Sequence, residues 1–495
     1  MASIEELRSD RLKKKALLEE KGINPYPAES KRTDTIESFS SNFATYESEK
    51  KTVTIAGRIM SKRGQGAISF CDIYDGTGRV QAFLKADEMD KAAYELFNDT
   101  VDMGDFVEIT GTAYITQRGA NSIFVSGWTM LAKSLLPIPD AHYGLKDEDE
   151  RFRKRYLDIL INEEVREVVY KRSIFWNTIR QYLLEKSFVE VETPILENTT
   201  GGAEARPFVT HHNALDIDVY LRISAGELWQ KKLLVAGIPR TFEIGRIFRN
   251  EGISNEHLQD YTQLEYYMAY ADYNQGMDMT KELYRLIAQK TFGKTTFTIK
   301  GFEVDLDAEW KMYDFAKLVQ EKSGLDVITE TYNGNTVEEK DLIKICKKFD
   351  IKYDDGGLNI VRVADMVWKT IRKEIAGPGF LIGVPVSMEP LAKKSRTNPE
   401  VVERFQVILA GSEMGKGFSE LNDPVDQKER FMHQQSLRDG GDDEAQMADM
   451  EFVEALEHGM PPAFGFGLSE RLFSFLMDKP VREAQLFPLL KPRND

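Results

Sequence analysis

Phe-Arg-Asn-Glu-Gly at residues 248–252 and Tyr-Thr-Gln-Leu-Glu at residues 261–265 flank a short polar segment. Arg249 and Glu251 are two residues apart on a predicted strand, so their side chains share one face and can address the same ligand. A planar guanidinium suits the α-phosphate of a nucleotide. The stretch therefore predicts one half of a nucleotide site.

A second arginine supplies the other half of this pattern. Arg471 follows the glycine-rich run Gly-Phe-Gly at 465–467. A guanidinium plane stacks on aromatic rings, so Arg471 and Tyr261 can hold the two faces of a base. A surface hairpin with ordinary ion pairs would give the same short patterns, and that alternative stays open for either half alone.

The chain has 495 residues, of which 42% are hydrophobic and 29% are charged. This length and composition indicate a globular protein of two or three domains. No apolar run approaches the roughly 20 residues of a membrane span, and the N-terminus lacks the apolar core of a signal peptide. We expect a cytoplasmic protein without membrane partners. Cys71 and Cys346 are too few and too far apart for a disulfide framework or a structural zinc site.

The net charge of −16 does not decide whether the chain binds nucleic acid. Basic side chains recur between Arg8 and Lys15 and again between Arg151 and Arg155. Such clusters serve RNA phosphates in some proteins, but more often they are solvated helix faces.

Five segments with alternating apolar and polar residues predict a small β-barrel. The segments are 53–60, 67–74, 78–84, 106–115 and 122–129. A five-stranded, partly open barrel is the oligonucleotide-binding type, in which strand side chains hold unstacked bases. Phe70 and Gln81 are candidates for that role, although a buried Phe and a solvated Gln would look the same.

A second domain begins near residue 140, where helical periodicity replaces the strand pattern. Strand signals recur at 206–223, 240–249 and 261–270 with hairpin-length turns, which favours an antiparallel α+β domain. Lys- and Glu-rich residues 310–375 interrupt the strands and predict a helical insertion.

The sequence thus predicts a multidomain α+β protein. The expected parts are an N-terminal helical extension (1–50), the barrel (51–135), a linker (136–160) and the second domain (161–495).

Four glutamates stand beside apolar or aromatic neighbours, where an unpaired charge would be costly. They are Glu227, Glu265, Glu413 and Glu420. Magnesium with ATP phosphates would satisfy some of them, and the ammonium of a substrate would satisfy others. For any one of them taken singly, an internal pair with Arg or Lys is the favoured explanation.

Four longer stretches carry a resemblance to a known family. They are Arg-Pro-Phe-Val-Thr-His-His-Asn-Ala-Leu-Asp at 206–216, Phe-Arg-Asn-Glu-Gly-Ile-Ser at 248–254, Tyr-Met-Ala-Tyr-Ala-Asp-Tyr at 267–273 and Gly-Phe-Ser-Glu-Leu-Asn-Asp at 417–423. With them the chain resembles the class II lysyl-tRNA synthetases from residue 22 to residue 488.

The resemblance implies an N-terminal anticodon-binding barrel of the oligonucleotide-binding type and a class II catalytic domain around an antiparallel sheet. It implies ligation of L-lysine to tRNA(Lys) through lysyl-adenylate, with ATP consumed and AMP and pyrophosphate released. Magnesium would be the cofactor, and a homodimer would form through the segment ending at Pro194. Catalysis would be positioning plus electrostatic stabilisation of an in-line displacement.

The resemblance also assigns residues to each function. The implied catalytic residues are Arg249, Glu251 and Arg471. The implied ATP site is Arg249, Glu251, His257, Tyr261, Glu413 and Arg471. The implied lysine site is Gly202, Glu227, Arg249, Glu265, Tyr267, Lys416, Phe418 and Glu420. The implied metal ligands are Glu413 and Glu420, and the implied anticodon contacts are Arg58, Phe70 and Gln81.

In the barrel, Ala120 takes the place of a Glu that the family has, and the glycine-rich run before Arg471 is one residue short. Four further positions, all in the second domain, depart from the family pattern. Lys416 replaces an Asn, Gln406 replaces a metal-binding Glu, and Ser412 and Glu256 each replace an Arg. One hypothesis is that Lys416 supplies a cation near the substrate carboxylate or the phosphates. The alternative is that Lys416 lies in a turn and its side chain points to solvent.

Two other functions stay open. A synthetase-like enzyme could pass activated lysine to a non-tRNA acceptor or make dinucleotides, and a catalytically silent protein could only bind tRNA or nucleotide. The barrel argues against the first, and retention of Arg249, Glu413 and Arg471 argues against the second.

Overall fold

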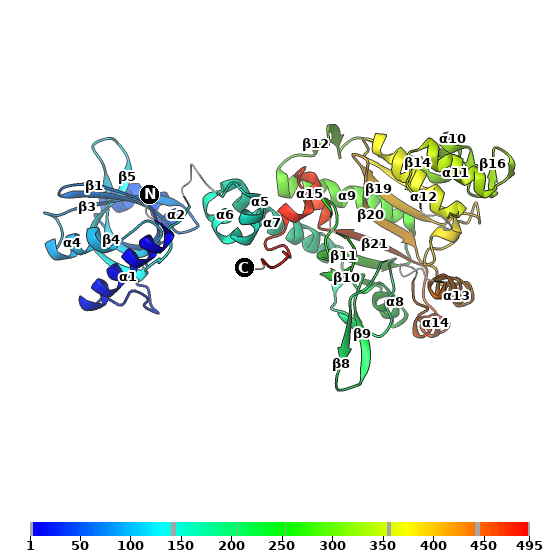
Figure 1. Cartoon of the computed structure of the whole chain (residues 1–495), viewed down its shortest axis with the longest axis horizontal. Coiled ribbons are helices and arrows are strands. Elements are labelled where there is room, and N and C mark those ends of the chain that lie inside the picture. Colours follow the sequence, from blue (N-terminus) through cyan, green and yellow to red (C-terminus); the bar gives the residue numbers. More distant parts are fainter. Residues whose placement is uncertain are drawn as a thin grey trace. The chain divides into compact units, whose positions relative to one another are not determined.

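The computed structural model describes residues 3–139, 145–203, 205–252, 254–353, 358–440 and 446–493. The chain divides into two compact units, residues 1–162 and residues 163–495 (Figure 1). Among the residues that the structure describes, none of the helices combines the length and apolar composition of a membrane span.

The first unit contains the predicted five-stranded barrel. Its strands are β1 (Thr52–Gln65), β2 (Ile68–Tyr74), β3 (Arg79–Lys85), β4 (Phe106–Ile115) and β5 (Asn121–Ala132). They follow the order β1-β2-β3-β5-β4, and β1 pairs with β4 from Thr52 to Arg58. This pairing closes the barrel, which the sequence predicted as partly open.

Strand alternation builds the core of the barrel, because every second side chain points inward. Ile55, Ile109 and Ile123 are all fully buried on this inner side. Four helices surround the barrel: α1 (Ile4–Glu20), α2 (Ile36–Ser41), α3 (Phe43–Ser48) and α4 (Lys91–Thr100). Two more, α5 (Glu148–Arg153) and α6 (Arg155–Ile161), lie in the segment predicted as a linker.

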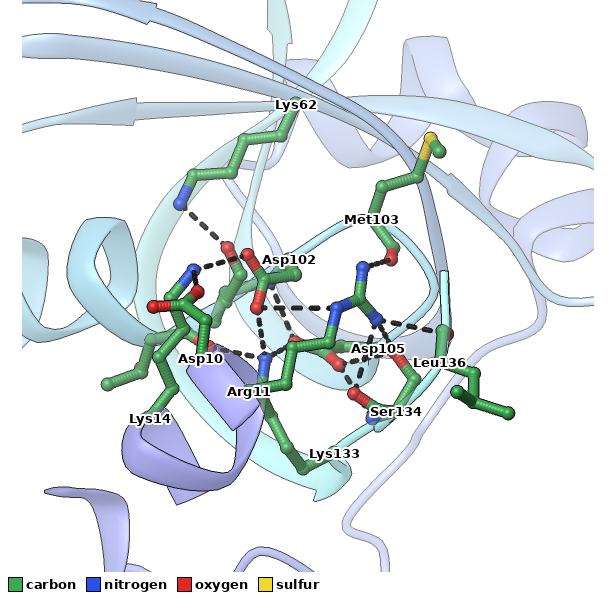
Figure 2. Close-up of polar contacts among 12 residues, drawn as sticks. Asp10, Arg11, Lys14, Lys62, Asp102, Met103, Asp105, Lys133, Ser134 and Leu136 are labelled. Atoms are coloured by element: carbon green, nitrogen blue, oxygen red, sulfur yellow. Dashed lines mark hydrogen bonds and ion pairs between the residues drawn. The ribbon is translucent and has the colours of Figure 1, made fainter. Parts of the chain in front are cut away.

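Buried ion pairs hold α1 against the barrel (Figure 2). Lys133 Nζ donates to Thr100 O at 2.7 Å and lies 2.6 Å from Asp102 Oδ2 and 2.7 Å from Asp105 Oδ2. Lys14 Nζ lies 2.7 Å from Asp102 Oδ1, and Arg11 Nη2 donates to the carbonyl of Met103 at 2.9 Å. Part of the basic run at residues 8–15 therefore serves the fold rather than RNA.

The pKa of Asp102 reflects this network. Burial alone would raise it, but hydrogen bonds from Lys133 and Lys14 outweigh burial and hold it below its ordinary value of 3.8. A carboxyl with a lowered folded-state pKa stabilises the fold above its unfolded pKa, and this contribution is lost as the pH falls through the folded pKa.

We expect Lys133→Met to destabilise the first unit by about 3 kcal/mol at pH 7, because it leaves the buried Asp105 carboxylate without its ammonium and Asp102 with only Lys14 and Arg11. Hydrogen–deuterium exchange of β1 to β5 should show the loss. The difference from the wild-type protein should shrink as the pH falls below about 3.8 and through the lower folded-state pKa of Asp102, where this carboxyl takes up a proton. Lys91→Met is the control, since Lys91 is 83% exposed and its ion pair is at the surface. Equal protection in both variants at pH 7 would contradict the prediction.

The second unit is built on an eight-stranded sheet with the order β14-β18-β19-β20-β21-β11-β10-β6. In that order the strands are Lys311–Asp314, Gly379–Ile382, Arg404–Leu409, Ser412–Ser419, Ala463–Ser469, Asp260–Ala269, Arg240–Phe248 and Val189–Glu190. The inner pairs are antiparallel as predicted, whereas β14 with β18 and β10 with β6 are parallel. Parallel neighbours need long connections, and the helical insertion supplies the one between β14 and β18.

Two long helices, α7 (Glu163–Glu185) and α9 (Tyr273–Phe292), share one hydrophobic core with the sheet. Phe175 of α7, Tyr284 of α9 and Tyr266 of β11 are all fully buried in it. Asp272 caps α9 by accepting hydrogen bonds from the backbone of Asn274 and Gln275, which fixes where the helix begins.

The remaining elements surround this sheet. The insertion has α10 (Phe315–Ser323), β15 (Leu325–Asp326), β16 (Thr331–Tyr332), β17 (Asn335–Thr336), α11 (Glu339–Lys348), α12 (Ile360–Ile371) and the 3-10 turn η1 (Arg372–Glu374). Elsewhere lie β7 (Leu196–Glu197), β8 (Val209–His212), β9 (Ile217–Leu221), α8 (Glu227–Val235), β12 (Thr296–Ile299), β13 (Phe302–Asp305), η2 (Val386–Met388), α13 (Pro424–Asp439), α14 (Met450–Glu457), α15 (Arg471–Leu476) and α16 (Val481–Ala484).

Candidate active site

Three buried carboxylates meet where β11, β20 and β21 lie side by side and α8 packs on β11. Glu227 begins α8, Glu265 lies in β11, and Glu420 directly follows β20. Their residue exposures are 6%, 3% and 1%. Burial of this much like charge marks the place as a functional candidate.

The Glu265 carboxylate is the best satisfied of the three. Its Oε1 accepts hydrogen bonds from the backbone N of Ala225 at 3.0 Å and from Gln263 Nε2 at 2.7 Å. Its Oε2 accepts from the Tyr267 hydroxyl at 3.0 Å. Burial and the charge of Glu227 nevertheless raise the pKa of Glu265 above its usual range. The pocket therefore favours either a proton or a cation at this carboxylate.

Lys231 lies among these carboxylates, and sequence inspection missed it. It is fully buried, and its Nζ lies 2.7 Å from Glu227 Oε1 and 2.6 Å from Glu420 Oε2. Burial alone would lower the pKa of Lys231, but the charges of Glu227 and Glu420 raise it, so the ammonium stays charged. The i, i+4 spacing of Glu227 and Lys231 was visible in the sequence, but it usually marks an exposed helix pair.

Two glycines let the carboxylates pack closely against the backbone. Gly465 of β21 pairs with Tyr267 on one side and with Phe418 on the other. A methyl group on Gly465 would lie only 2.2 Å from Glu420 Oε1. Gly202, with φ of +84°, lies against Glu227 in the same way, since a methyl group there would be 3.0 Å from Glu227 Oε2. The predicted lysine-site residues Gly202, Glu227, Glu265, Tyr267, Phe418 and Glu420 thus come together.

The predicted nucleotide residues form a neighbouring group. Arg249 donates from Nε and Nη2 to the carbonyl of Ile223, both at 3.3 Å, and its guanidinium carbon lies 5.9 Å from the centroid of the Tyr261 ring. Burial is the main cause that lowers the pKa of His257, and the charge of Arg471 lowers it further. Burial is also the main cause that raises the pKa of Tyr261, and the charge of Glu251 contributes to this rise. These side chains are therefore electrostatic neighbours.

One detail of the predicted local structure is wrong. The sequence predicted Arg249 and Glu251 on a strand, but β10 ends at Phe248. Both side chains leave the loop that follows, so strand alternation does not place them on one face. The antiparallel register continues for one more backbone hydrogen bond, from Arg249 N to Gln259 O, and the chain then enters the loop.

Glu413 belongs to the nucleotide side. Its Oε1 accepts from Trp368 Nε1 at 2.8 Å and lies 3.8 Å from Arg372 Nε. The charge of Glu413 also acts on the half-buried guanidinium of Arg471. Arg372 was not predicted, and no local motif marks it, because it reaches this place from the end of the helical insertion.

The two predicted metal ligands do not form one cluster. Glu413 is near the start of β20 and Glu420 follows its end. Among the residues that the structure describes, no group of three or more His, Cys, Asp or Glu side chains could hold a metal ion.

The four positions that depart from the family pattern each have a partner. Lys416 Nζ lies 2.6 Å from Glu389 Oε2, and Gln406 accepts a hydrogen bond from Arg404. Lys300 Nζ, a second residue that was not predicted, donates to Ser412 Oγ at 3.0 Å and to Glu256 Oε1 at 2.5 Å. Glu256 also pairs with Arg471.

The barrel carries a row of half-buried aromatic rings on one face. Phe70 stacks on Phe83 with ring centroids 4.9 Å apart, and Phe83 stacks on Tyr114 at 5.6 Å. Gln81 accepts from Ser122 Oγ at 3.2 Å next to this row. Arg58 lies over the Phe106 ring at 4.3 Å. Phe83 and Tyr114 were not predicted, although the strand period that selects Phe70 in β2 selects Phe83 in β3 as well.

Sequence comparison agrees with this division of the chain. Residues 147–491 match the sequence profile of the tRNA synthetases class II (D, K and N), and residues 53–131 match that of the OB-fold nucleic acid binding domain. The chain belongs to the class II tRNA synthetases. Its second unit therefore holds the synthetase domain, and its barrel is the OB-fold domain.

Curated relatives are similar over the whole length. The lysine–tRNA ligase of Carboxydothermus hydrogenoformans is 42% identical over 99% of both chains. Those of Thermoanaerobacter pseudethanolicus and Thermotoga maritima are 41% and 40% identical, each over 99% of this chain and 97% of the relative.

We expect Gly465→Ala to raise the KM for the amino acid at least tenfold in amino-acid-dependent pyrophosphate exchange. The added methyl group would lie 2.2 Å from Glu420 Oε1 and 2.4 Å from Tyr267 Cε1, so the carboxylate must move. Gly467→Ala is the matched control in the same strand, because its methyl group would meet Glu265 Cγ at an ordinary 3.4 Å. An equal KM in the two variants would show that Gly465 does not shape the amino-acid pocket.

Proposed function

We propose that this class II tRNA synthetase ligates L-lysine to tRNA(Lys) through lysyl-adenylate. The observation that carries the proposal is the buried group of Glu227, Glu265 and Glu420 beside Tyr267. Aspartate and asparagine are the other two amino acids of this family. A negatively charged aspartate side chain would be repelled by these carboxylates, and an asparagine side chain would leave them without a cation.

Lysine fits the pocket at both ends. Glu265, Tyr267 and Glu420 would hold the ε-ammonium, and Phe418 would contact the alkyl chain. Gly202 and Glu227 would hold the α-ammonium. An analogue without the ε-ammonium would leave buried carboxylates unpaired, at a cost of about 1–3 kcal/mol.

ATP would occupy the neighbouring group of cations and Tyr261. The adenine would lie between Tyr261 and Arg471, with Glu251 and His257 in contact with the nucleotide. Arg249 would bridge the lysine carboxylate and the α-phosphate, since a guanidinium offers donors to two oxyanions at once. Lys416 would lie near the substrate carboxylate, and its present partner is Glu389.

Activation would be an in-line displacement. A carboxylate oxygen of lysine attacks the α-phosphorus of ATP, the bond from that phosphorus to the bridging oxygen breaks, and pyrophosphate leaves with the electron pair. Arg249 would stabilise the charge that develops on the α-phosphate, and no protein nucleophile is needed. Glu251, Arg249 and Arg471 would act by holding the two substrates in this geometry.

Transfer would complete the reaction. A hydroxyl of the terminal ribose of tRNA attacks the carbonyl carbon of lysyl-adenylate, loses its proton and displaces AMP. Positioning of the two reactants is again the main contribution of the protein.

Magnesium is the proposed cofactor, with Glu413 as its main protein ligand. Magnesium in nucleotide sites commonly takes one or two carboxylates together with phosphate oxygens. Glu413 is half-buried beside Arg471 and fits this requirement. Glu420 fits less well, because it is fully buried against Lys231. When bound with ATP, the ion would neutralise part of the phosphate charge.

The OB-fold barrel would bind the anticodon. Phe70 lies at one end of the aromatic row and would stack on a base, while Gln81 and Arg58 would contact bases or backbone next to it.

A homodimer and a cytoplasmic location complete the proposal. Leu196, Val209 and Leu215 are 49%, 59% and 65% exposed on and next to the small sheet of β7, β8 and β9. Apolar side chains gathered on one surface favour contact with another protein surface. Both ATP and tRNA are available in the cytoplasm.

The test is pyrophosphate exchange with each standard amino acid, followed by charging of total tRNA with the amino acid that responds. We expect exchange with lysine alone and formation of lysyl-tRNA. Exchange without charging would favour a synthetase-like enzyme with another acceptor, and no exchange would favour a binding protein.

We expect Phe70→Ala to weaken tRNA binding by about 1–3 kcal/mol, the scale of one lost base stack. Charging should show a raised KM for tRNA, whereas lysine-dependent pyrophosphate exchange should be unchanged. Ile115→Ala is the control, because Ile115 is 46% exposed on the barrel and offers no ring. An equal loss in charging and exchange would contradict the division of roles between the two units.

A further inference from the structure

Lys231 is placed where a ligand cation is expected. Its side chain comes from α8, is 1% exposed and reaches two acidic residues from different elements, Glu227 and Glu420. Three aromatic rings enclose the ammonium, with Nζ 5.3 Å from the centroid of Phe418, 5.8 Å from Tyr267 and 5.9 Å from Phe452.

The charges around this ammonium do not balance. Three buried carboxyl groups, Glu227, Glu265 and Glu420, face the single ammonium of Lys231, so two of them need either a proton or a further cation. Uncompensated charge in a buried site is costly until a partner arrives. Lysine brings two ammonium groups, and its carboxylate would be matched by Arg249. The resident and incoming charges then balance.

Lys231 contacts only one oxygen of each of its two carboxylate partners. Its Nζ contacts Oε1 of Glu227 and Oε2 of Glu420. The opposite oxygens, Glu227 Oε2 and Glu420 Oε1, are the ones that lie beside Gly202 and Gly465. Glu420 Oε1 is buried and accepts no hydrogen bond from any residue that the structure describes.

We infer that Lys231 is a positioning and specificity-determining residue, whose ammonium fixes Glu227 and Glu420 and adjusts the pocket to a substrate with two ammonium groups. The inference rests on the proposed lysine specificity. Without the Lys231 charge, one carboxylate must either take up a proton or turn into the substrate space. Either change removes an acceptor that the substrate ammonium groups need.

The experiment compares Lys231→Met with Lys232→Met in lysine-dependent pyrophosphate exchange by the full-length protein. Lys232 is the next residue on α8, but it is half-buried, and its Nζ is 4.0 Å from Asp449 and 3.9 Å from Glu451. We expect Lys231→Met to raise the KM for lysine at least tenfold, or about 1.4 kcal/mol. The KM for ATP and kcat should stay within about threefold of wild type. Lys232→Met should match wild type in all three values.

The outcomes separate specificity from folding and from the proposed function. An unchanged KM for lysine in a folded Lys231→Met protein would overturn the inference, and so would an equal rise in the KM for ATP. If Lys231→Met does not fold, Lys231→Gln carries the same prediction, because it keeps an N–H donor but lacks the charge. Failure of both variants to fold, with Lys232→Met folded, would assign Lys231 to the fold and overturn its role in specificity. Absence of lysine exchange in the wild-type protein would instead contradict the proposed function.

Discussion

Burial of three carboxylates in one place is the constraint on which the catalytic unit depends. Glu227, Glu265 and Glu420 come from a helix, a strand and the end of another strand, and each is almost completely buried. Such a group is stable only if donors, a resident cation or a ligand offset the repulsion. The donors are the Ala225 backbone and the Tyr267 hydroxyl, and the resident cation is Lys231.

The sheet provides the geometry that this group requires. β21 lies between β11 and β20, and its residue Gly465 faces Tyr267 and Phe418 on its two sides. A side chain on Gly465 would overlap Glu420 Oε1 and the Tyr267 ring, so the glycine lets both side chains pack directly against the β21 backbone. Arg471 follows the same strand at the start of α15, which brings the nucleotide and amino-acid sides of the site onto one framework.

The sequence predicted the elements and residues that local patterns encode. Strand alternation located all five barrel strands, and linear stretches marked the positions of Arg249, Glu265 and Glu420. It did not predict Lys231 as a buried residue, because Glu227 and Lys231 at i and i+4 have the spacing of an exposed surface pair. Arg372 was missed for another reason: its approach to Glu413 depends on the path of an inserted segment, which no local period contains.

Two buried lysines in this chain show how charge balance separates a structural site from a binding site. Lys133 in the barrel unit uses its three donors on Thr100, Asp102 and Asp105, and Arg11 and Lys14 add positive charge to the same network. That network needs no further ion. Lys231 has two carboxylate partners, and the third carboxylate nearby, Glu265, keeps a raised pKa. The same pairing of a lysine with two acids therefore completes one site and leaves the other able to take a cation. The difference is the charge balance around each pair: two further cations lie beside the acids of Lys133, whereas a third carboxyl group lies beside those of Lys231.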